Sequence, residues 1–183
     1  MRIVLLGATG FLGHHLLPQL SAAGHECTAL TRYRPGCRDL TVLPRVTVRQ
    51  VKTWDTETLS SLFEGADAVV NMVGILNEKG RKGEGFRKVH VELLENVIAA
   101  CKAAGVRRVV HVSAVGAGQG ESFYLKSKGE AERLLKSDQD IDATIVQPSV
   151  IFGRGDDFFN RFAALLKAMP MLPLACPDAR MQP

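Results

Sequence analysis

Short apolar runs alternate with helical patterns along most of the chain. Six runs predict strands, at residues 2–7, 26–32, 45–51, 67–74, 107–115 and 142–151. Most of them contain consecutive β-branched or aliphatic residues, which strands buried on both faces need. Helical patterns follow at residues 12–22, 55–64, 86–104, 122–136 and 156–168. Strands and helices that alternate through short connections predict an α/β fold with a doubly wound parallel sheet and right-handed crossovers.

The clearest helical pattern lies at residues 86–104. Val89, Leu93, Val97 and Cys101 stand four apart, and Gly105 follows where a helix commonly ends. The spacing predicts that these four side chains form the buried face of one continuous helix.

The first apolar run leads directly into the sequence GATGFLG, residues 7–13. In a strand–turn–helix unit, Gly7 permits a tight turn, Gly10 leaves room for a pyrophosphate, and Gly13 lets the helix pack close to the sheet. Backbone N–H groups and the positive end of the helix then face the phosphates. The context predicts a dinucleotide-binding Rossmann fold, against the alternative of a glycine turn that serves packing alone.

The end of the second run bears on which dinucleotide binds. An NAD-specific fold usually has Asp or Glu here for the ribose hydroxyls. This chain has Thr31, Arg32, Tyr33 and Arg34, and the first acid is Asp39. A guanidinium can bind a 2′-phosphate through two hydrogen bonds, whereas a carboxylate repels it. The charge pattern predicts NADP, with NAD less favoured; the alternative is that Arg32 is only a solvated surface residue.

Composition excludes several classes of protein. The 183 residues have room for about one domain, and 46% of them are hydrophobic, enough to form a core. Lys and Arg total 23 against 19 Asp and Glu, in short scattered groups without a basic stripe. We therefore expect no nucleic-acid partner.

The four cysteines form no C-x-x-C pair, and no Cys/His group has zinc spacing, so we expect free thiols and no metal site. No signal peptide and no apolar run of membrane-spanning length are visible. A cytoplasmic location is the expectation.

Four further stretches share with GATGFLG a resemblance to a known family. They are NMVGIL (71–76), VHVELLENVIAACKAAGVRRVVHVSAVGA (89–117), YLKSKGEAE (124–132) and QPSVIFGRGDDFFNRF (147–162). Together they resemble the atypical or extended short-chain dehydrogenases/reductases. The most similar branch contains the nucleotide-binding accessory subunit of respiratory complex I and its bacterial relatives.

That resemblance covers nearly the whole chain, but the family adds strands and a C-terminal substrate portion. It implies an NAD(P)-binding Rossmann domain at residues 1–168. The proline-rich residues 169–183 would then be the start of a truncated C-terminal segment.

The resemblance also implies a set of cofactor-binding residues. They are Gly7, Thr9, Gly10, Phe11, Leu12, Gly13, Arg32, Asn71, Val73, Gly74, Ser113, Tyr124, Lys128, Pro148, Ser149 and Val150. One position departs from the family pattern, because Lys52 stands where extended members often have an Asp that contacts adenine.

Tyr124 and Lys128 stand four apart, so a helix would place both on one face. By the resemblance, Tyr124 is the acid/base at the substrate oxygen. Lys128 and the oxidised nicotinamide lower the Tyr124 pKa, and Lys128 also holds the nicotinamide ribose. The alternative is an exposed Tyr–Lys pair on a surface helix. Ser113 would polarise the substrate carbonyl, although the extended-family position falls at Val115. The histidines have no partner at ligand spacing and are assigned no role.

Three functions remain open. The first is hydride transfer to a small carbonyl or quinone-related substrate. The second is that of a non-catalytic NADPH-binding structural or sensing subunit, whose partner would be a membrane-associated respiratory complex and whose location would be peripheral to a membrane. The third is that of a nucleotide-sugar epimerase or dehydratase, disfavoured because SAVGA (113–117) replaces a Ser/Thr-rich stretch. Formation of a homo-oligomer is also left open.

Overall fold

The computed structural model describes residues 1–33, 37–78, 80, 82–156 and 158–168. The chain divides into two compact units, Met1–Gln147 and Pro148–Pro183. The second unit contains helix α6 (Phe158–Ala168). Residues 169–183, which the sequence assigns to a C-terminal segment, lie outside the described residues.

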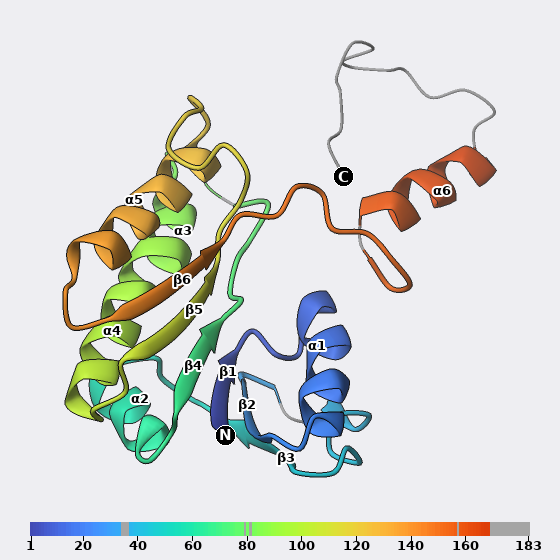
Figure 1. Ribbon diagram of the computed structural model, residues 1–183. Helices are drawn as coiled ribbons and strands as arrows, with labels where there is room; N and C mark the ends of the chain where they lie inside the picture. Colours follow the sequence, from blue (N-terminus) through green and yellow to red (C-terminus); the bar gives the residue numbers. More distant parts are fainter. Residues whose placement is uncertain (34–36, 79, 81, 157, 169–183) are drawn as a thin grey trace. The chain divides into compact units, whose positions relative to one another are not determined.

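The first unit is built on a parallel six-stranded sheet with the order β3-β2-β1-β4-β5-β6 (Figure 1). Its strands are β1 (Arg2–Leu6), β2 (Glu26–Thr31), β3 (Val46–Gln50), β4 (Ala68–Asn71), β5 (Arg108–Val112) and β6 (Asp142–Val146). All six predicted strands are confirmed. The strand order reverses between β1 and β4, where Leu6 pairs with Asn71.

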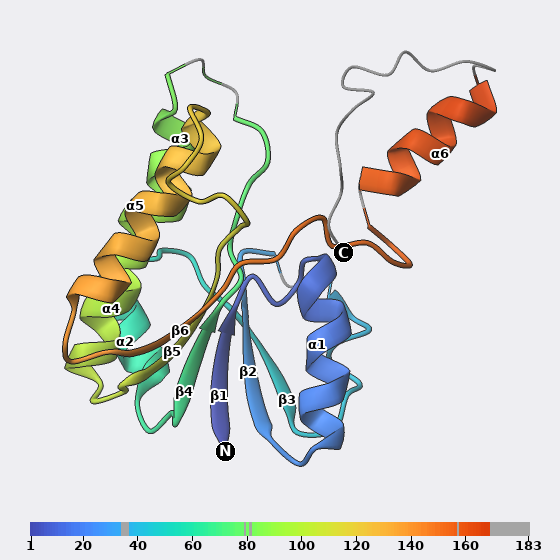
Figure 2. The ribbon, with the colours of Figure 1, turned by 45° about the horizontal axis from the view of Figure 1, so that its top comes forward.

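Helices cover both faces of this sheet, as Figure 2 shows. They are α1 (Phe11–Ala22), α2 (Thr56–Phe63), α3 (Glu84–Arg87), α4 (Leu93–Ala103) and α5 (Phe123–Ser137). One apolar core, with Leu5, Leu17 and Ala29, lies between the sheet and α1. The other, with Phe63 and Leu94, lies between the sheet and α2, α4 and α5. The doubly wound Rossmann arrangement is therefore confirmed.

The segment expected to be one continuous helix at residues 86–104 differs from the prediction. A π-helical turn, Lys88–Glu92, separates α3 from α4. A π-helical turn has more residues than an α-helical turn, so it rotates the buried face. His90 and Leu94 are buried there, whereas Val89 and Leu93, expected on the buried face, are only partly buried. The predicted register is correct from Val97 onward and wrong before it.

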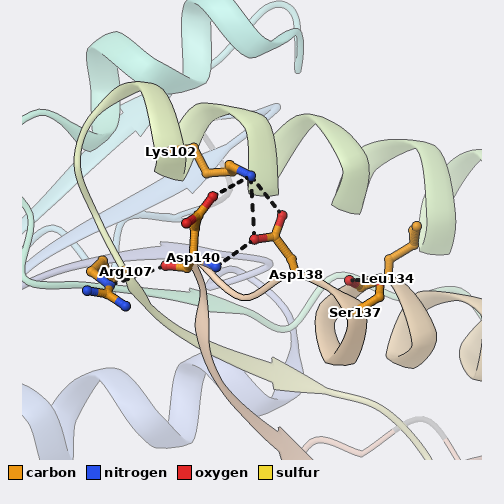
Figure 3. A network of polar contacts seen from close by, with 6 residues as sticks. All are labelled: Lys102, Arg107, Leu134, Ser137, Asp138 and Asp140. Atoms are coloured by element: carbon orange, nitrogen blue, oxygen red, sulfur yellow. Dashed lines mark hydrogen bonds and ion pairs between the residues drawn. The ribbon is translucent and has the colours of Figure 1, made fainter.

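Ion pairs connect the end of α4 to the turn between α5 and β6 (Figure 3). Lys102 Nζ lies 3.1 Å from Asp138 Oδ2 and 2.9 Å from Asp140 Oδ2. The Asp140 backbone N–H donates to Asp138 Oδ1 at 3.0 Å, and Arg107 Nε donates to the Asp140 carbonyl at 3.3 Å. These contacts fix α5 beside α4 at the end remote from Tyr124.

Candidate functional site

Two glycines of the turn after β1, Gly7 and Gly13, have no space for a side chain. Gly7 has φ +77°, and an added Cβ would lie 2.9 Å from the Met72 carbonyl carbon and 3.0 Å from Val73 N. A Cβ on Gly13 would overlap the backbone of Ala8. These glycines therefore bring the turn against the end of β4 and bring α1 against the turn, as the sequence predicts.

Helix α1 begins at this turn, and no side chain offsets the partial positive charge of its N-terminus. Gly10 is its N-cap, no side chain caps it, and its first turn has no acidic residue. By contrast, the Asp55 side chain caps α2, and Ser122 caps α5. Unpaired N–H groups and the helix dipole favour an anion at such an end. The turn thus fits the pyrophosphate of a dinucleotide, and Phe11 and Leu12 supply the first helical N–H groups.

At the end of β2, hydrogen bonds hold the backbone in place. The Tyr33 N–H donates to Thr31 Oγ1 at 3.2 Å, and Gln50 Nε2 donates to the Arg32 carbonyl at 3.0 Å. The Arg32 side chain is exposed, whereas Arg34 lies outside the described residues. Asp39, the first acid after β2, pairs with His14 on α1 (Oδ2–Nε2 2.9 Å).

The strand order reverses between β1 and β4, and the loop after β4 lies across this reversal from the glycine turn and the end of β2. Asn71 is 2% exposed, and its Oδ1 accepts the Val73 N–H at 3.1 Å. Gly74 is exposed, and a Cβ there would lie 3.5 Å from Lys128 Nζ and 3.7 Å from His90 Nε2. A side chain at position 74 would therefore lie directly against this ammonium, whereas glycine leaves that space free.

Tyr124 and Lys128 lie one turn apart on α5, so the predicted helical placement is confirmed. Lys128 is buried and donates from Nζ to the Val112 carbonyl at 3.1 Å. Burial lowers the Lys128 pKa to about 8, against the opposing effect of Glu132. Tyr124 is half-buried, edge-on to the rings of Phe86 and His90. Burial raises the Tyr124 pKa in the free protein, and the lowering expected from Lys128 and the oxidised nicotinamide stays a prediction.

Ser113 directs its hydroxyl to a buried carboxylate. Its Oγ donates to Glu132 Oε1 at 2.6 Å, and Glu132 also accepts from Gln147 Nε2 at 2.6 Å and Lys136 Nζ at 2.9 Å. Burial would raise the Glu132 pKa, but these hydrogen bonds outweigh it and lower that pKa. The Ser113 proton is therefore engaged, and its role toward a substrate carbonyl stays a prediction.

Three residues of this site were not predicted from the sequence: His90, Ser127 and Glu132. All three are buried. His90 turns inward because of the π-helical turn, which no pattern in the sequence indicates. Glu132 and Ser127 could have been suspected, since each shares the inner face of α5 with Tyr124 or Lys128.

Three predicted cofactor-binding residues do not belong to the first unit. Pro148, Ser149 and Val150 belong to the second unit, so their contact with a cofactor stays a prediction.

Cys27, Cys37 and Cys101 are buried free thiols. Across the described residues, no cluster of His, Cys, Asp and Glu could hold a metal ion. Within the same residues, no helix is long and apolar enough to cross a membrane.

Comparison with known proteins identifies relatives of the chain. It is 32% identical to ceramide reductase of Caulobacter vibrioides over 184 residues, which is 97% of this chain and 55% of that protein. It is 31% identical to the mitochondrial NADH dehydrogenase [ubiquinone] 1 alpha subcomplex subunit 9 of Mus musculus, over 87% of this chain and 43% of that protein. The chain thus spans about half the length of these curated relatives.

A solved structure of similar fold is a putative NAD-dependent epimerase/dehydratase from Bacillus halodurans. It has a TM-score of 0.70 and 27% identity over 85% of this chain and 74% of that one. The sequence model of the NAD(P)H-binding family matches residues 7–156, from the glycine turn to beyond the last strand. The resemblance to short-chain dehydrogenases/reductases is confirmed, and the chain belongs to the NAD(P)H-binding family.

Proposed function

We propose that this domain binds NADPH and uses Tyr124 and Lys128 to reduce a small carbonyl or quinone-related substrate. The observation that supports this most is the placement of Lys128. Its buried ammonium lies beside exposed Gly74 and one helical turn from Tyr124. An ammonium with no side chain between it and the exposed backbone of Gly74 is suited to bind the hydroxyl groups of a ribose placed over that glycine.

In this proposal, the two halves of the sheet hold different halves of the cofactor. A dinucleotide bound where the strand order reverses has one nucleotide on each side. The glycine turn would bind the pyrophosphate through backbone N–H groups, and Arg32 would bind the 2′-phosphate. Asn71, Val73 and Gly74 would border the nicotinamide half, together with Lys128.

When bound, the reduced nicotinamide supplies a hydride to the substrate carbon. Tyr124 donates its phenolic proton to the substrate oxygen, which completes reduction of the carbonyl to an alcohol. The Tyr124 phenol is protonated at neutral pH, as a proton donor must be; its raised pKa also makes it a weaker acid, so the transfer relies on Lys128 to stabilise the phenolate. Lys128 orients the ribose and stabilises the phenolate that remains.

Two observations favour a second candidate, a non-catalytic NADPH-binding subunit. The Ser113 hydroxyl is engaged by Glu132, and the raised pKa makes the Tyr124 phenol a weaker acid toward a substrate oxygen. One relative is named as a subunit of NADH dehydrogenase, so the partner would be a membrane-associated respiratory complex. Nucleotide-sugar epimerase or dehydratase chemistry would use the same Tyr124 and Lys128, and no described contact favours it.

Calorimetry with NADPH and NADH tests the cofactor assignment. Arg32→Ala should weaken NADPH binding by about 10- to 100-fold, the cost of a charge-assisted hydrogen bond, and leave NADH binding nearly unchanged. Arg49→Ala, an exposed arginine on β3, is the matched control. Equal losses for both cofactors would show that Arg32 does not read the 2′-phosphate.

Stopped-flow oxidation of NADPH across a panel of carbonyls and quinones separates the two candidates. Tyr124→Phe keeps the ring packing and deletes the transferable proton, so it should abolish turnover while NADPH affinity is retained. Identical traces for the wild type and Tyr124→Phe would reject the catalytic proposal and leave the cofactor-binding subunit.

A further inference from the structure

We propose that His90 is a positioning residue that fixes the loop after β4 to α5 and so aligns the nicotinamide half of the site with Lys128. This inference rests on the proposed binding of a dinucleotide across the reversal of strand order. It concerns binding geometry and holds whether or not the bound cofactor is turned over.

The hydrogen bonds of His90 form a directed chain between the two elements. The Ile75 backbone N–H donates to His90 Nε2 at 3.1 Å, so Nε2 is the unprotonated nitrogen. Nδ1 then bears the proton and donates to Ser127 Oγ at 2.8 Å. Ser127 in turn donates to the Tyr124 carbonyl at 2.8 Å. Ile75 directly follows Gly74, and Ser127 directly precedes Lys128.

Only a neutral imidazole can make both contacts, and the surroundings keep His90 neutral. Its side chain is 1% exposed. Burial, with the nearby Lys128 ammonium and His111, lowers its pKa to about 3. The link therefore persists across the physiological pH range.

The π-helical turn brings this side chain into the site. His90 lies in the middle of the turn Lys88–Glu92, where the buried face rotates away from the α-helical register. Such turns are rare and frequently occur at functional sites. Its ring also lies edge-on to Tyr124, with centroids 5.5 Å apart. Through His90, the π-helical turn thus contacts both the loop at Gly74 and the beginning of α5.

A second buried histidine supplies a matched comparison. His111 on β5 is also 1% exposed, and burial lowers its pKa to about 4. Within the described residues neither of its ring nitrogens has a hydrogen-bond partner. The same substitution at the two sites therefore separates loss of the link from loss of a buried imidazole.

The test measures binding of NADPH and of adenosine 2′,5′-bisphosphate, a fragment limited to the adenosine half. His90→Phe should weaken NADPH binding about tenfold, the value of roughly one hydrogen bond, and change fragment binding less than twofold. His90→Gln offers an acceptor for Ile75 and a donor for Ser127, so it should recover most of the NADPH affinity. His111→Phe should change neither affinity.

Urea unfolding shows whether each variant is folded. If His90→Phe does not fold, Ser127→Ala breaks the same chain and leaves the His90 ring packed. Unchanged NADPH affinity in a folded variant, or equal loss for both ligands, would overturn the positioning role. A wild type that binds neither ligand would instead overturn the proposed function, and this inference with it.

Discussion

Replacing Lys128 by Met should stabilise the free protein and weaken its binding of NADPH. The Lys128 side chain is 3% exposed, and its described hydrogen bond goes to the Val112 carbonyl. The one carboxylate that acts on its pKa, Glu132, is already bonded to Ser113, Gln147 and Lys136. A methionine of similar length would bury the same volume without a charge.

The pKa of Lys128 sets the size of the effect. Burial lowers it from 10.5 to about 8, and each unit corresponds to 1.36 kcal/mol, so the charged form costs on the order of 3 kcal/mol. Loss of the hydrogen bond to Val112 offsets about 1 kcal/mol of this. At pH 7 we expect Lys128→Met to raise the free energy of unfolding by roughly 2 kcal/mol.

The pH dependence provides a sharper signature. Below pH 8 Lys128 is charged in both the folded and unfolded states, so the full free-energy cost of burying its charge is present. Between about pH 8 and pH 10.5 the unfolded chain binds the extra proton, so the stability of the wild type rises with pH. The advantage of Lys128→Met should therefore shrink over this interval.

Urea unfolding followed by circular dichroism from pH 7 to pH 10 measures both effects, and calorimetry measures NADPH binding. Lys126→Met, an exposed lysine on the same helix, should change stability by less than about 0.5 kcal/mol. A destabilised Lys128→Met whose deficit is constant with pH would refute the reasoning, because the ammonium would then be well solvated or well paired.

Two further predictions concern the turn and the buried carboxylate. Gly13→Ala should lower the free energy of unfolding by about 3 kcal/mol, because its Cβ would overlap Ala8. Gly10→Ala should stay folded and lose NADPH binding, since its Cβ would meet only the Gly7 carbonyl oxygen, at 3.3 Å. Equal urea midpoints for the two variants would contradict this difference. Because the pKa of Glu132 is lower in the folded protein than its ordinary value of 4.5, the ionised carboxylate stabilises the folded state. This contribution to the free energy of unfolding is complete above pH 4.5 and is lost as the pH falls through the folded-state pKa. Thermal unfolding from pH 3 to pH 7 should show a shallower acid loss for Glu132→Gln, and superimposable acid profiles would count against a paired carboxylate.

The sequence could predict the fold because the decisive signals are local. Each strand is a short apolar run, and each helix repeats its apolar residues at helical spacing. The glycine turn is equally local, since Gly7, Gly10 and Gly13 are close in sequence and their geometry follows from their missing side chains. The same holds for the placement of Tyr124 and Lys128, which four-residue spacing determines within α5.

The contacts that set the chemistry of the site were beyond prediction because they join distant segments. Glu132 reaches Ser113 across 19 positions, and His90 reaches Ser127 across 37. Burial beside Phe86 and His90 raises the Tyr124 pKa in the free protein, an effect that the four-residue spacing does not reveal. Helical spacing shows only that Tyr124 and Lys128 share a face; packing decides how deeply each is buried.

Most of the buried polar residues in the described part of the chain gather around the proposed nicotinamide half of the site. Of the ten buried polar residues in the described part of the chain, seven come from β4, β5 and the elements that cover them: Asn71, His90, His111, Ser113, Ser127, Lys128 and Glu132. Burying such groups costs stability wherever their hydrogen bonds are incomplete. The cost is clearest at Lys128, whose charge opposes folding. The glycine turn has no comparable cost and could bind the phosphates on its own. In the proposed function the cost at Lys128 is offset by what this residue does for a bound cofactor, because its ammonium would hold the nicotinamide ribose and stabilise the phenolate of Tyr124.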